Sequence, residues 1–420
     1  MLFTLYRSSM TMMQPLLYIL GKWRCRKGKE DPQKLPQRFG IMPPSLIPKH
    51  PVIWFHGASI GEGRAALSVM KRILEDWPET DIILTSQSVS AIKALALDLP
   101  PQVTHGMMPY DVPRYMQRFL EHWKPMAFFL LEAELWPTML YELSRRGVPM
   151  TLLNFHISEK SARRWALAPS LFKKMMRFFS HRWTGCSASY ARFKHLVDLP
   201  IGIMPSIKYA PGALRQHRAE PFIIQRPFWF ASCVHAEEET LIRETHLELI
   251  KTIPDLLCIY APRHIHRVQS IVKEPWNLAI QQRSLHETLK KETQVYLVDT
   301  LGEMRLFYEI SPFVVLCGSF CSVGGHNPIE PARFQCAVMH GPDMANQRDV
   351  MEDFSQQKAA YQVNAHGLCD AILHCLQHPK ETKHMAERAY HWVCHKEGEM
   401  ERHLQVFSAA LKKSYNRQRV

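Results

Sequence analysis

The chain has 420 residues, of which 46% are hydrophobic, and a formal net charge of +13 at pH 7. This length exceeds the usual limit for one hydrophobic core and therefore predicts two domains. A basic balance suits nucleic acid, an anionic membrane or an anionic small substrate, but no arginine-rich block, zinc-finger spacing or aromatic nucleic-acid motif is present. We therefore expect the last two kinds of partner and no nucleic acid.

The N-terminal segment carries a membrane signal. Residues 2–20 are largely apolar but are interrupted by polar residues and by Pro15. Basic residues follow directly, at Lys22, Arg24, Arg26, Lys27 and Lys29. An apolar segment with a basic flank either crosses the bilayer or lies in its interface, attracted to anionic lipid. We predict that 1–34 is a membrane-associating segment on the cytoplasmic side.

The first chemically informative loop runs from His56 to Gly63. It follows an apolar run at 52–55 and precedes apolar residues at 66, 67, 69, 70, 73 and 74, which have helical spacing. Glu62 is therefore expected where the carboxyl end of a strand meets a helix N-terminus, the place where open parallel sheets bind ligands. The structural alternative is a carboxylate that only complements the helix dipole.

Short apolar runs alternate with helical segments along the rest of the chain. They lie at 52–55, 82–85, 127–131, 150–153, 228–232, 256–261, 295–298, 313–317 and 337–339. This alternation predicts doubly wound α/β sheets. A proline-rich stretch without clear periodicity divides the series, so we predict a first Rossmann-like domain at 35–210, a linker at 211–227 and a second domain at 228–420.

A second glycine-rich loop follows the apolar run at 313–317. It contains Gly318 and the sequence Gly324 to Glu330, and it leads into a predicted helix. Backbone N–H groups and the positive end of a helix dipole at such a junction can approach a phosphate, while a carboxylate one turn into the helix can accept from ribose hydroxyls. The pattern indicates a nucleotide site; the structural alternative is a loop that only turns the chain.

Five ordered motifs together resemble those of the bacterial Kdo transferases, which move 3-deoxy-D-manno-oct-2-ulosonic acid (Kdo) onto lipid A precursors. They are His56-x-x-Ser59-x-Gly61-Glu62, Leu131-Glu132-Ala133-Glu134-Leu135-Trp136-Pro137, Pro262-Arg263-His264, Asp299-Thr300-Leu301-Gly302-Glu303 and Gly324-Gly325-His326-Asn327-Pro328-x-Glu330. The resemblance runs from about Met1 to about Cys394.

The resemblance implies a GT-B fold, in which two Rossmann-like domains face a central cleft. It further implies inverting transfer of Kdo from CMP-Kdo to a lipid A precursor (lipid IVA) in lipopolysaccharide core synthesis, at the cytoplasmic face of the inner membrane. We expect no cofactor and no metal, because a CMP leaving group has one phosphate and the chain has no Asp-x-Asp motif.

The resemblance also implies roles on the acceptor side. Glu62 matches the catalytic glutamate and is expected to be the general base, with Ser59 and Gly61 beside it. Glu132 and Glu134 are further catalytic candidates, which would point to opposite faces if the strand before them continued. One would order the acceptor, and the other would pair with a basic residue.

The donor side draws on the remaining motifs. Lys208 and Arg263 are candidates to pair with the sugar carboxylate and the CMP phosphate, in an order left open. Glu330 is the expected ribose acceptor, and Asn327 is either a phosphate contact or a plain helix cap. The full predicted donor set is Lys208, Arg263, His264, Gly302, Glu303, Met304, Gly318, Gly325, Asn327 and Glu330.

The chain departs from the family pattern at two charged positions, because His156 stands where an arginine is usual and Ala210 where an aspartate is usual. Two alternatives therefore stay open. One is another GT-B enzyme, a transferase or epimerase that uses a uridine nucleotide. The other is a catalytically silent, membrane-bound relative. The number of Kdo residues transferred, the acylation and phosphorylation of the acceptor and the oligomeric state are also open.

Overall fold

The structure, a computed structural model, describes residues 2–418 apart from 97, 133, 208–221, 274–275, 286–288 and 301. The predicted donor residue Lys208 and most of the predicted linker lie outside the described residues. The chain forms two compact units, Met1–Ala213 with Lys396–Val420, and Leu214–His395. The stretch after residue 395, which the sequence analysis assigned to the second domain, thus groups with the first unit.

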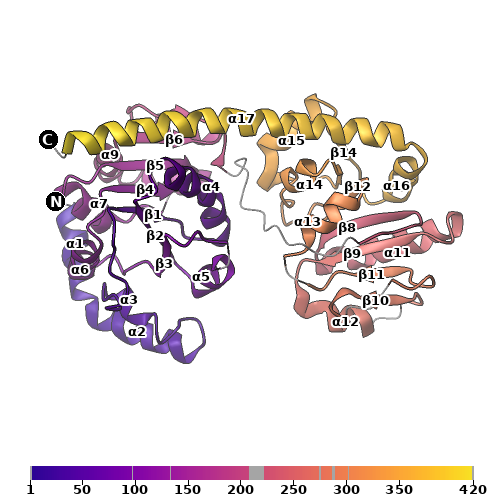
Figure 1. Cartoon of the computed structure of the whole chain (residues 1–420), viewed down its shortest axis with the longest axis horizontal. Helices are drawn as coiled ribbons and strands as arrows, with labels where there is room; N and C mark the ends of the chain where they lie inside the picture. The colour runs from indigo at the N-terminus through magenta and orange to yellow at the C-terminus, as the bar shows by residue number, and fades with distance from the viewer. Residues whose placement is uncertain are drawn as a thin grey trace. The chain divides into compact units, whose positions relative to one another are not determined.

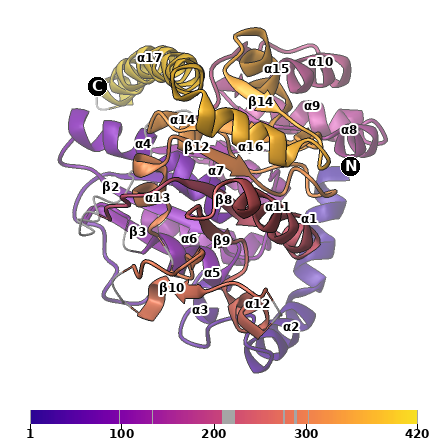
Figure 2. The ribbon, with the colours of Figure 1, turned by 90° about the vertical axis from the view of Figure 1, so that its right-hand side faces the viewer.

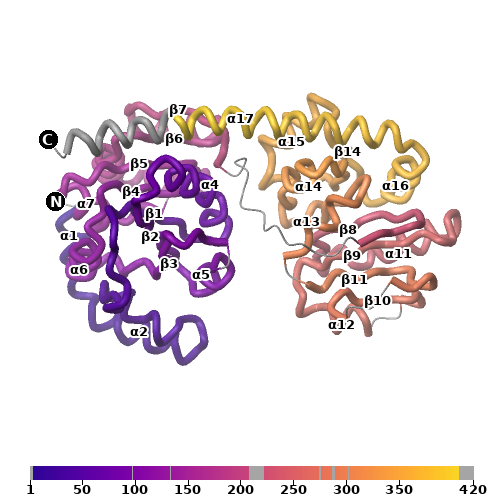
Figure 3. Tube along the Cα trace, in the orientation of Figure 1, coloured from indigo at the N-terminus to yellow at the C-terminus, as the bar shows by residue number. Residues whose placement is uncertain are grey.

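The first unit is built on a seven-stranded parallel sheet with the strand order β3-β2-β1-β4-β5-β6-β7 (Figure 1, Figure 3). The strands are β1 (Val52–His56), β2 (Asp81–Ser86), β3 (Val103–Met107), β4 (Ala127–Leu131), β5 (Met150–Phe155), β6 (His181–Thr184) and β7 (Gly202–Ile203). The order reverses between β1 and β4, and a reversal of this kind creates the crevice in which such sheets bind ligands.

Helices cover both faces of this sheet. Ile53 and Phe55 pack toward α4 (Ile60–Asp76) and α5 (Val89–Leu95), whereas Trp54 and Phe128 pack toward the helices of the other face. Those helices are α6 (Pro113–Trp123), α7 (Pro137–Arg145) and α9 (Pro169–Phe178), and α8 (Glu159–Trp165) and α10 (Ser187–Leu196) complete the unit. Because both faces are buried, the strands read as continuous apolar runs.

The N-terminal segment forms two helices, α1 (Leu2–Met12) and α2 (Gln14–Arg26), followed by the single turn α3 (Leu35–Arg38). Tyr6 donates a hydrogen bond of 3.0 Å to the buried Asp111, and Arg7 pairs with the buried Glu142 at 2.6 Å. Both contacts fasten α1 to the first unit. No helix in the described part of the chain is long and apolar enough to cross a membrane.

The second unit holds another seven-stranded parallel sheet, in the order β10-β11-β9-β8-β12-β13-β14. Its strands are β8 (Phe228–Val234), β9 (Leu257–Pro262), β10 (Ile280–Gln282), β11 (Val295–Leu297), β12 (Phe313–Leu316), β13 (Ala337–His340) and β14 (Ala360–Gln362). Here the order reverses between β8 and β12. The predicted fold class, two doubly wound α/β sheets, is confirmed.

The helices of the second unit also lie on both sides of its sheet (Figure 1, Figure 2). α11 (Glu239–Thr252) and α16 (Leu368–Gln377) pack on one face, and α13 (Met304–Ile310) packs on the other. The remaining helices are α12 (Val268–Lys273), α14 (Ile329–Arg333), α15 (Arg348–Gln356) and α17 (Pro379–Gln418). The last of these belongs to both units, because Ala386 lies in the core of the second and Met400 and Leu404 in the core of the first.

Candidate active site

Glu62 lies in the first turn of α4, directly beyond the carboxyl end of β1. Its Oε2 accepts a hydrogen bond of 2.8 Å from the backbone N–H of Ala58, and its Oε1 accepts one of 2.7 Å from the Ser59 hydroxyl. Ser59 is the N-cap of the helix and accepts in turn from the backbone N–H of Glu62 at 3.2 Å. The side chain is thereby held in one orientation at the switch point of the sheet.

The surroundings of Glu62 suit a general base. The residue is 8% exposed, and burial raises the pKa of its carboxyl above the ordinary value of 4.5, with the nearby Glu132 carboxylate raising it further. Hydrogen bonds from Ser59 and Ala58 and the neighbouring His56 oppose that rise. A carboxylate offers about four acceptor positions, so the two hydrogen bonds leave capacity for a substrate hydroxyl. The structural alternative, a carboxylate that complements the helix dipole, has the same geometry. One carboxylate can fill both roles.

Glu134 lies in the loop after β4, and β4 is the second of the two strands between which the order of the sheet reverses. Its Oε2 lies 3.4 Å from Nε2 of His56 and accepts a hydrogen bond of 3.2 Å from the indole N–H of Trp136. Burial raises the pKa of this carboxyl, but the hydrogen bonds from His56, Trp136 and Gln87 outweigh it and hold the pKa below the ordinary value. Glu134 therefore has a basic residue, His56, as a partner, and which of the two glutamates orders the acceptor stays a prediction.

Glu132 does not continue the strand. β4 ends at Leu131, and Glu132 has a φ of 58°, although its backbone N–H still donates to Leu153 at 3.0 Å. The alternation of side chains along the strand therefore ends at Leu131 and does not place Glu132 and Glu134 on opposite faces of the sheet. The two residues instead belong to one loop beside β1, and Glu132 is close enough to raise the pKa of Glu62.

The glycine-rich loop of the second unit is held by a buried carboxylate. Glu238 is 1% exposed and accepts hydrogen bonds from the backbone N–H groups of His235 at 3.1 Å, Gly318 at 2.7 Å and Phe320 at 3.0 Å. Gly324 and Gly325 donate to Asp343 and to the carbonyl of Gly318. These four loop amides have acceptors within the protein, and the expected contact of the loop with a phosphate stays a prediction.

Imidazole rings and an arginine gather at the same loop. Nε2 of His235 lies 2.8 Å from Nε2 of His326, and the ring of His264 meets that of His235 edge-on at 5.8 Å. Burial, together with His235, Arg263 and His264, lowers the pKa of His326 to about 4. Gly318 has a φ of 73°, and a Cβ there would lie 2.8 Å from the His326 ring, so only glycine fits. Imidazole and guanidinium side chains therefore lie beside this loop and can offer donors to an anion.

Several predicted donor residues have structural partners. Glu303 receives two hydrogen bonds from Arg283, of 3.1 and 2.9 Å, and one from Thr300, in the turn formed by Gly302 before α13 begins at Met304. Asn327 accepts from the backbone N–H of Ile329 at 3.1 Å, which is an Asx turn directly before the helix; the N-cap position itself is held by Pro328. The helix that holds Glu330 is only five residues long, so its dipole is small.

Sequence motifs contained the partner residues without assigning them roles. His56 and His326 stand in two of the five motifs. The missing information was contact: His56 meets Glu134 across 78 residues of sequence, and Glu238 meets Gly318 across 80. A carboxylate three residues after a potential cap, as Glu238 is after His235, was the available signal. A Cβ at Gly61 would meet the Ser59 hydroxyl at 3.9 Å, an ordinary contact distance, so the space around it does not require a glycine.

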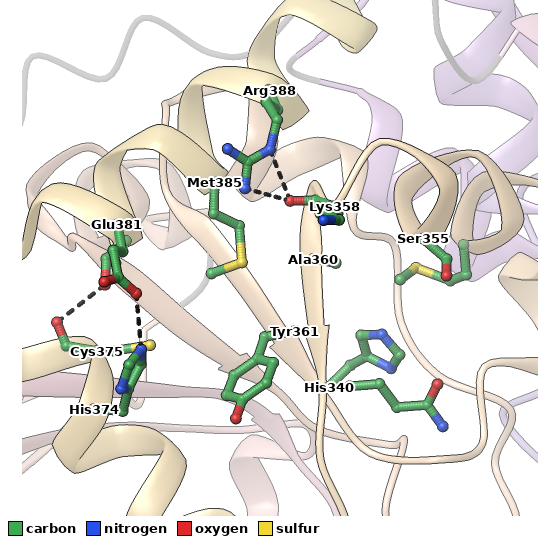
Figure 4. Close-up of a pocket in the computed structure, with 13 residues that line it drawn as sticks. His340, Ser355, Lys358, Ala360, Tyr361, His374, Cys375, Glu381, Met385 and Arg388 are labelled. Atoms are coloured by element: carbon green, nitrogen blue, oxygen red, sulfur yellow. Dashed lines mark hydrogen bonds and ion pairs between the residues drawn. The ribbon is translucent and has the colours of Figure 1, made fainter. Parts of the chain in front are cut away.

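A separate cavity of about 440 Å³ lies in the second unit between β14, α15, α16 and α17 (Figure 4). None of the predicted site residues lines it. Arg388 donates to the backbone carbonyl of Lys358 at 2.9 and 2.6 Å, and Glu381 pairs with His374 at 3.1 Å. The Arg388 guanidinium is thus bound to a backbone carbonyl and the Glu381 carboxylate to His374, and the cavity is separate from the candidate site.

Comparison with known families agrees with the sequence motifs. Residues 33–210 match the family model of 3-deoxy-D-manno-octulosonic-acid transferase (kdotransferase). A probable mitochondrial 3-deoxy-D-manno-octulosonic acid transferase of Arabidopsis thaliana is 34% identical over 81% of this chain and 79% of its own length. The 3-deoxy-D-manno-octulosonic acid transferase of Rickettsia bellii is 29% identical over 94% of this chain and 96% of its own.

Solved structures share the fold. A glycosyltransferase from Rickettsia africae covers 87% of this chain and 99% of its own, with a TM-score of 0.57 at 11% identity. A UDP-GlcNAc 2-epimerase from Neisseria meningitidis covers 81% and 95%, with a TM-score of 0.55 at 12% identity. These likenesses confirm the GT-B fold class, while the arrangement of the domains around a cleft stays a prediction. With the family match and the identity to the Arabidopsis enzyme, the chain belongs to the 3-deoxy-D-manno-octulosonic acid transferases, a family of glycosyltransferases.

Proposed function

We propose that this protein transfers Kdo from CMP-Kdo to a lipid A precursor, lipid IVA, by a single inverting displacement with Glu62 as the general base. Membership of the Kdo transferase family supports the sugar, and the sequence motifs support the donor and the acceptor. Family membership also favours this reaction over the alternative of a uridine-nucleotide enzyme. The silent-relative alternative is decided by the experiment below.

One observation carries the mechanism: a buried, oriented carboxylate lies beyond the carboxyl end of β1 at a topological switch point. In the proposed step, Glu62 takes the proton of the acceptor hydroxyl while that oxygen bonds to the anomeric carbon of Kdo. The bond from this carbon to the phosphate oxygen breaks, and CMP leaves with the electron pair. A base with a raised pKa is better matched to proton removal near neutral pH than an ordinary glutamate.

The second unit supplies groups suited to the anionic donor. Arg263 is exposed at the end of β9, beside His264 and the His235–His326 pair. A guanidinium binds a phosphate or carboxylate through two parallel hydrogen bonds, and imidazole N–H groups add single donors. Arg263 is therefore assigned to the CMP phosphate or the sugar carboxylate. Lys208, the other candidate, lies outside the described residues.

The reaction is tested by incubating the purified chain with freshly prepared CMP-Kdo and lipid IVA, following both CMP release and the mass of the lipid. The variant Glu62→Gln keeps the size of the side chain but removes the base, and Glu75→Gln, on the exposed side of the same helix, is its matched control. We expect turnover by the wild type and by Glu75→Gln, and a loss of roughly a hundredfold or more in Glu62→Gln.

The same assay separates the alternatives. Equal turnover in Glu62→Gln would show that another group is the base. No turnover by the folded wild type, with either CMP-Kdo or a uridine nucleotide sugar, would support the silent-relative alternative. The mass ladder of the product counts the Kdo residues that are added.

We further propose that α1 and α2 hold the protein at the cytoplasmic face of the inner membrane by lying in the lipid interface. One side of these helices is buried in the first unit, through Phe3 and Leu17. The apolar residues Leu5, Met12, Leu16, Ile19 and Trp23 are 49–82% exposed. Apolar side chains beside a cluster of lysines and arginines are the composition of an interfacial helix.

Binding to vesicles tests this placement. The chain is expected to sediment with vesicles that contain anionic phospholipid and less with purely zwitterionic ones, because the basic flank contributes about 1 kcal/mol per charge near the surface. Leu16→Glu with Ile19→Glu should weaken binding, since both side chains are exposed and their loss leaves the core intact. Unchanged sedimentation of this double variant would contradict the assignment of α2.

A further inference from the structure

The helix α7 begins three residues after Glu134, and its N-cap residue, Trp136, makes no capping hydrogen bond. An indole cannot accept, and that of Trp136 instead donates to Oε2 of Glu134 at 3.2 Å. In α4, α5 and α8, by contrast, a serine holds this position and its hydroxyl accepts from the helix. The cap position of α7 therefore serves the candidate site, and the N–H groups of its first turn need another acceptor.

That acceptor is Asp111, in the loop after β3. Its Oδ2 accepts from the backbone N–H of Thr138 and its Oδ1 from that of Met139, both at 2.8 Å. Asp111 is 2% exposed, and burial, opposed by these hydrogen bonds, raises the pKa of its carboxyl to about 7. Backbone N–H groups can only donate, so both oxygens accept from α7 in either protonation state. The start of α7 is thus tied to a residue 27 positions earlier in the chain.

The helix α1 supplies a third contact of the same carboxyl group. The Tyr6 hydroxyl donates to Oδ2 of Asp111 at 3.0 Å. A second contact joins α1 to α7 further along, where Arg7 pairs with the buried Glu142 at 2.6 Å. The helix that we propose to lie in the lipid interface therefore packs directly on the helix that follows Glu134.

Trp136 connects the start of α7 with Glu134. Its backbone carbonyl accepts from the N–H of Leu140 at 3.1 Å, so its backbone belongs to the helix while its indole holds the Glu134 carboxylate. The other partner of the same oxygen is Nε2 of His56 on β1, at 3.4 Å. Glu134 is thus held between a strand and a helix, and a shift of the first turn of α7 would turn its carboxylate while His56 stays in place.

We propose that Asp111 is a positioning residue of the acceptor side, which fixes the start of α7 and, through Trp136, the direction of the Glu134 carboxylate, and that Tyr6 couples α1 to it. The proposal rests on the proposed function of this site. Of the two glutamates of the loop, it assigns the ordering of the acceptor to Glu134. Asp111 and Tyr6 do not touch the substrate; they act through Trp136.

Four substitutions test the proposal. Asp111→Asn keeps the shape but turns an amide N–H group toward one of the two backbone N–H groups, and Tyr6→Phe removes only the hydroxyl. Trp136→Phe removes the indole N–H. Arg7→Gln is the matched control, because it weakens the contact between the same two helices at Glu142, away from the start of α7.

The kinetic test uses lipid IVA dissolved in detergent, at a pH above the pKa of Asp111. We expect kcat/KM for the acceptor to fall roughly tenfold or more in Asp111→Asn and roughly threefold in Tyr6→Phe, and to change by less than about twofold in Arg7→Gln. The KM for CMP-Kdo should stay unchanged in all three. A rise of both KM values together would point to a general loss of structure and contradict a positioning role.

A double-mutant cycle shows whether Asp111 acts through Trp136. Trp136→Phe should lower kcat/KM about as much as Asp111→Asn does. The double variant should lose little more than either single one, because both changes release the same carboxylate. Full addition of the two losses would overturn the proposal.

The Trp136 indole gives a readout that does not depend on turnover. In protein labelled with nitrogen-15, the indole N–H signal of Trp136 is the one lost in Trp136→Phe. We expect this signal to move in Asp111→Asn and in Tyr6→Phe and to stay in Arg7→Gln, in samples that thermal unfolding shows to be folded. An unmoved signal in Asp111→Asn would show that the Asp111 carboxyl does not position Trp136.

The readouts separate the failures. If the wild type lacks turnover, the proposed function fails, and the indole signal alone decides whether Asp111 and Tyr6 fix Trp136. If Kdo transfer is established but Tyr6→Phe and Arg7→Gln lose activity equally, the general attachment of α1 is responsible and the proposal is wrong. Binding to anionic vesicles should be unchanged in Tyr6→Phe; a fall in parallel with activity would trace the loss to membrane contact instead.

Discussion

The Glu238 carboxylate accepts a hydrogen bond of 2.7 Å from the backbone N–H of Gly318 and so joins the ends of β8 and β12. These are the two strands between which the order of the second sheet reverses. The same carboxylate also accepts from His235 and Phe320. The shape of the glycine-rich loop therefore depends on one acidic side chain that is 80 residues distant in sequence.

Replacement of Glu238 by alanine should destabilise the second unit by roughly 3 kcal/mol, because one buried and two part-buried N–H groups lose their acceptor. Glu238→Gln should cost less, since one amide oxygen still accepts. The measurement is urea unfolding, with Glu237→Gln as the control because that neighbour is exposed. Equal stability of Glu238→Ala and Glu237→Gln would show that the Glu238 carboxylate does not stabilise the loop.

The acid limb of the pH–rate profile should reflect Glu62. Because its pKa is raised above 4.5, kcat/KM should fall as the pH drops through that raised value, where the base takes up a proton. Ser59→Ala removes a hydrogen bond that lowers the pKa and should move the limb to higher pH. Ser88→Ala removes the corresponding cap of α5 and leaves Glu62 untouched, so its limb should not move.

His246 should make the second unit less stable in acid. Its Nδ1 accepts from the indole N–H of Trp229 at 3.2 Å, its Nε2 lies 3.0 Å from the carbonyl of Gln294, and burial lowers its pKa to about 4. The unfolded chain, in which the pKa is near 6.5, binds a proton first as the pH falls, so stability is lost between pH 6.5 and 4. The full loss amounts to roughly 3 kcal/mol.

The contribution of His246 is isolated by urea unfolding at pH 7 and pH 5 in His246→Gln, which keeps a donor and an acceptor but does not titrate. The exposed His366→Gln is the control. The pH dependence should shrink in the first variant and persist in the second. Identical pH dependence in both would show that His246 is not held neutral.

Kdo transfer should continue in the presence of EDTA. A CMP leaving group carries one phosphate, whose charge a guanidinium such as that of Arg263 and nearby imidazoles can compensate. A nucleoside diphosphate would have two phosphates to compensate. The measurement is turnover before and after chelation; loss of activity that magnesium restores would refute this expectation.

Central strands were predictable from the sequence and edge strands were not. β1, β4, β8 and β12 are apolar on both faces because helices cover both sides of each sheet, and their runs stand out. The strands that were missed are β3, β6, β7, β10 and β14. All but β6 lie at a sheet edge, and β6 is next to one. Short strands with polar residues, such as Ile280–Gln282, carry no apolar run to detect.

Contacts of the site between residues close in sequence were predictable, and contacts between residues on different strands were not. Ser59 and Glu62 are three residues apart, and their cap geometry follows from that spacing. The pairing of Arg283 with Glu303 and of His56 with Glu134 required knowledge of which strands are neighbours. The same limit hid the engagement of Gly318 by Glu238, because a glycine-rich sequence does not reveal what its amides already bind.

The long helix α17 sets where this protein can be divided for expression. A gene fragment that ends at Ile207 would encode the whole first sheet but would lack Met400 and Leu404, which are buried against that sheet's helices. A fragment that begins at Phe228 and runs to the end of the chain would carry those two apolar side chains without their partners. A first unit that is expressed by itself therefore needs residues 396–405 returned to it, through a short designed connection or as an added peptide.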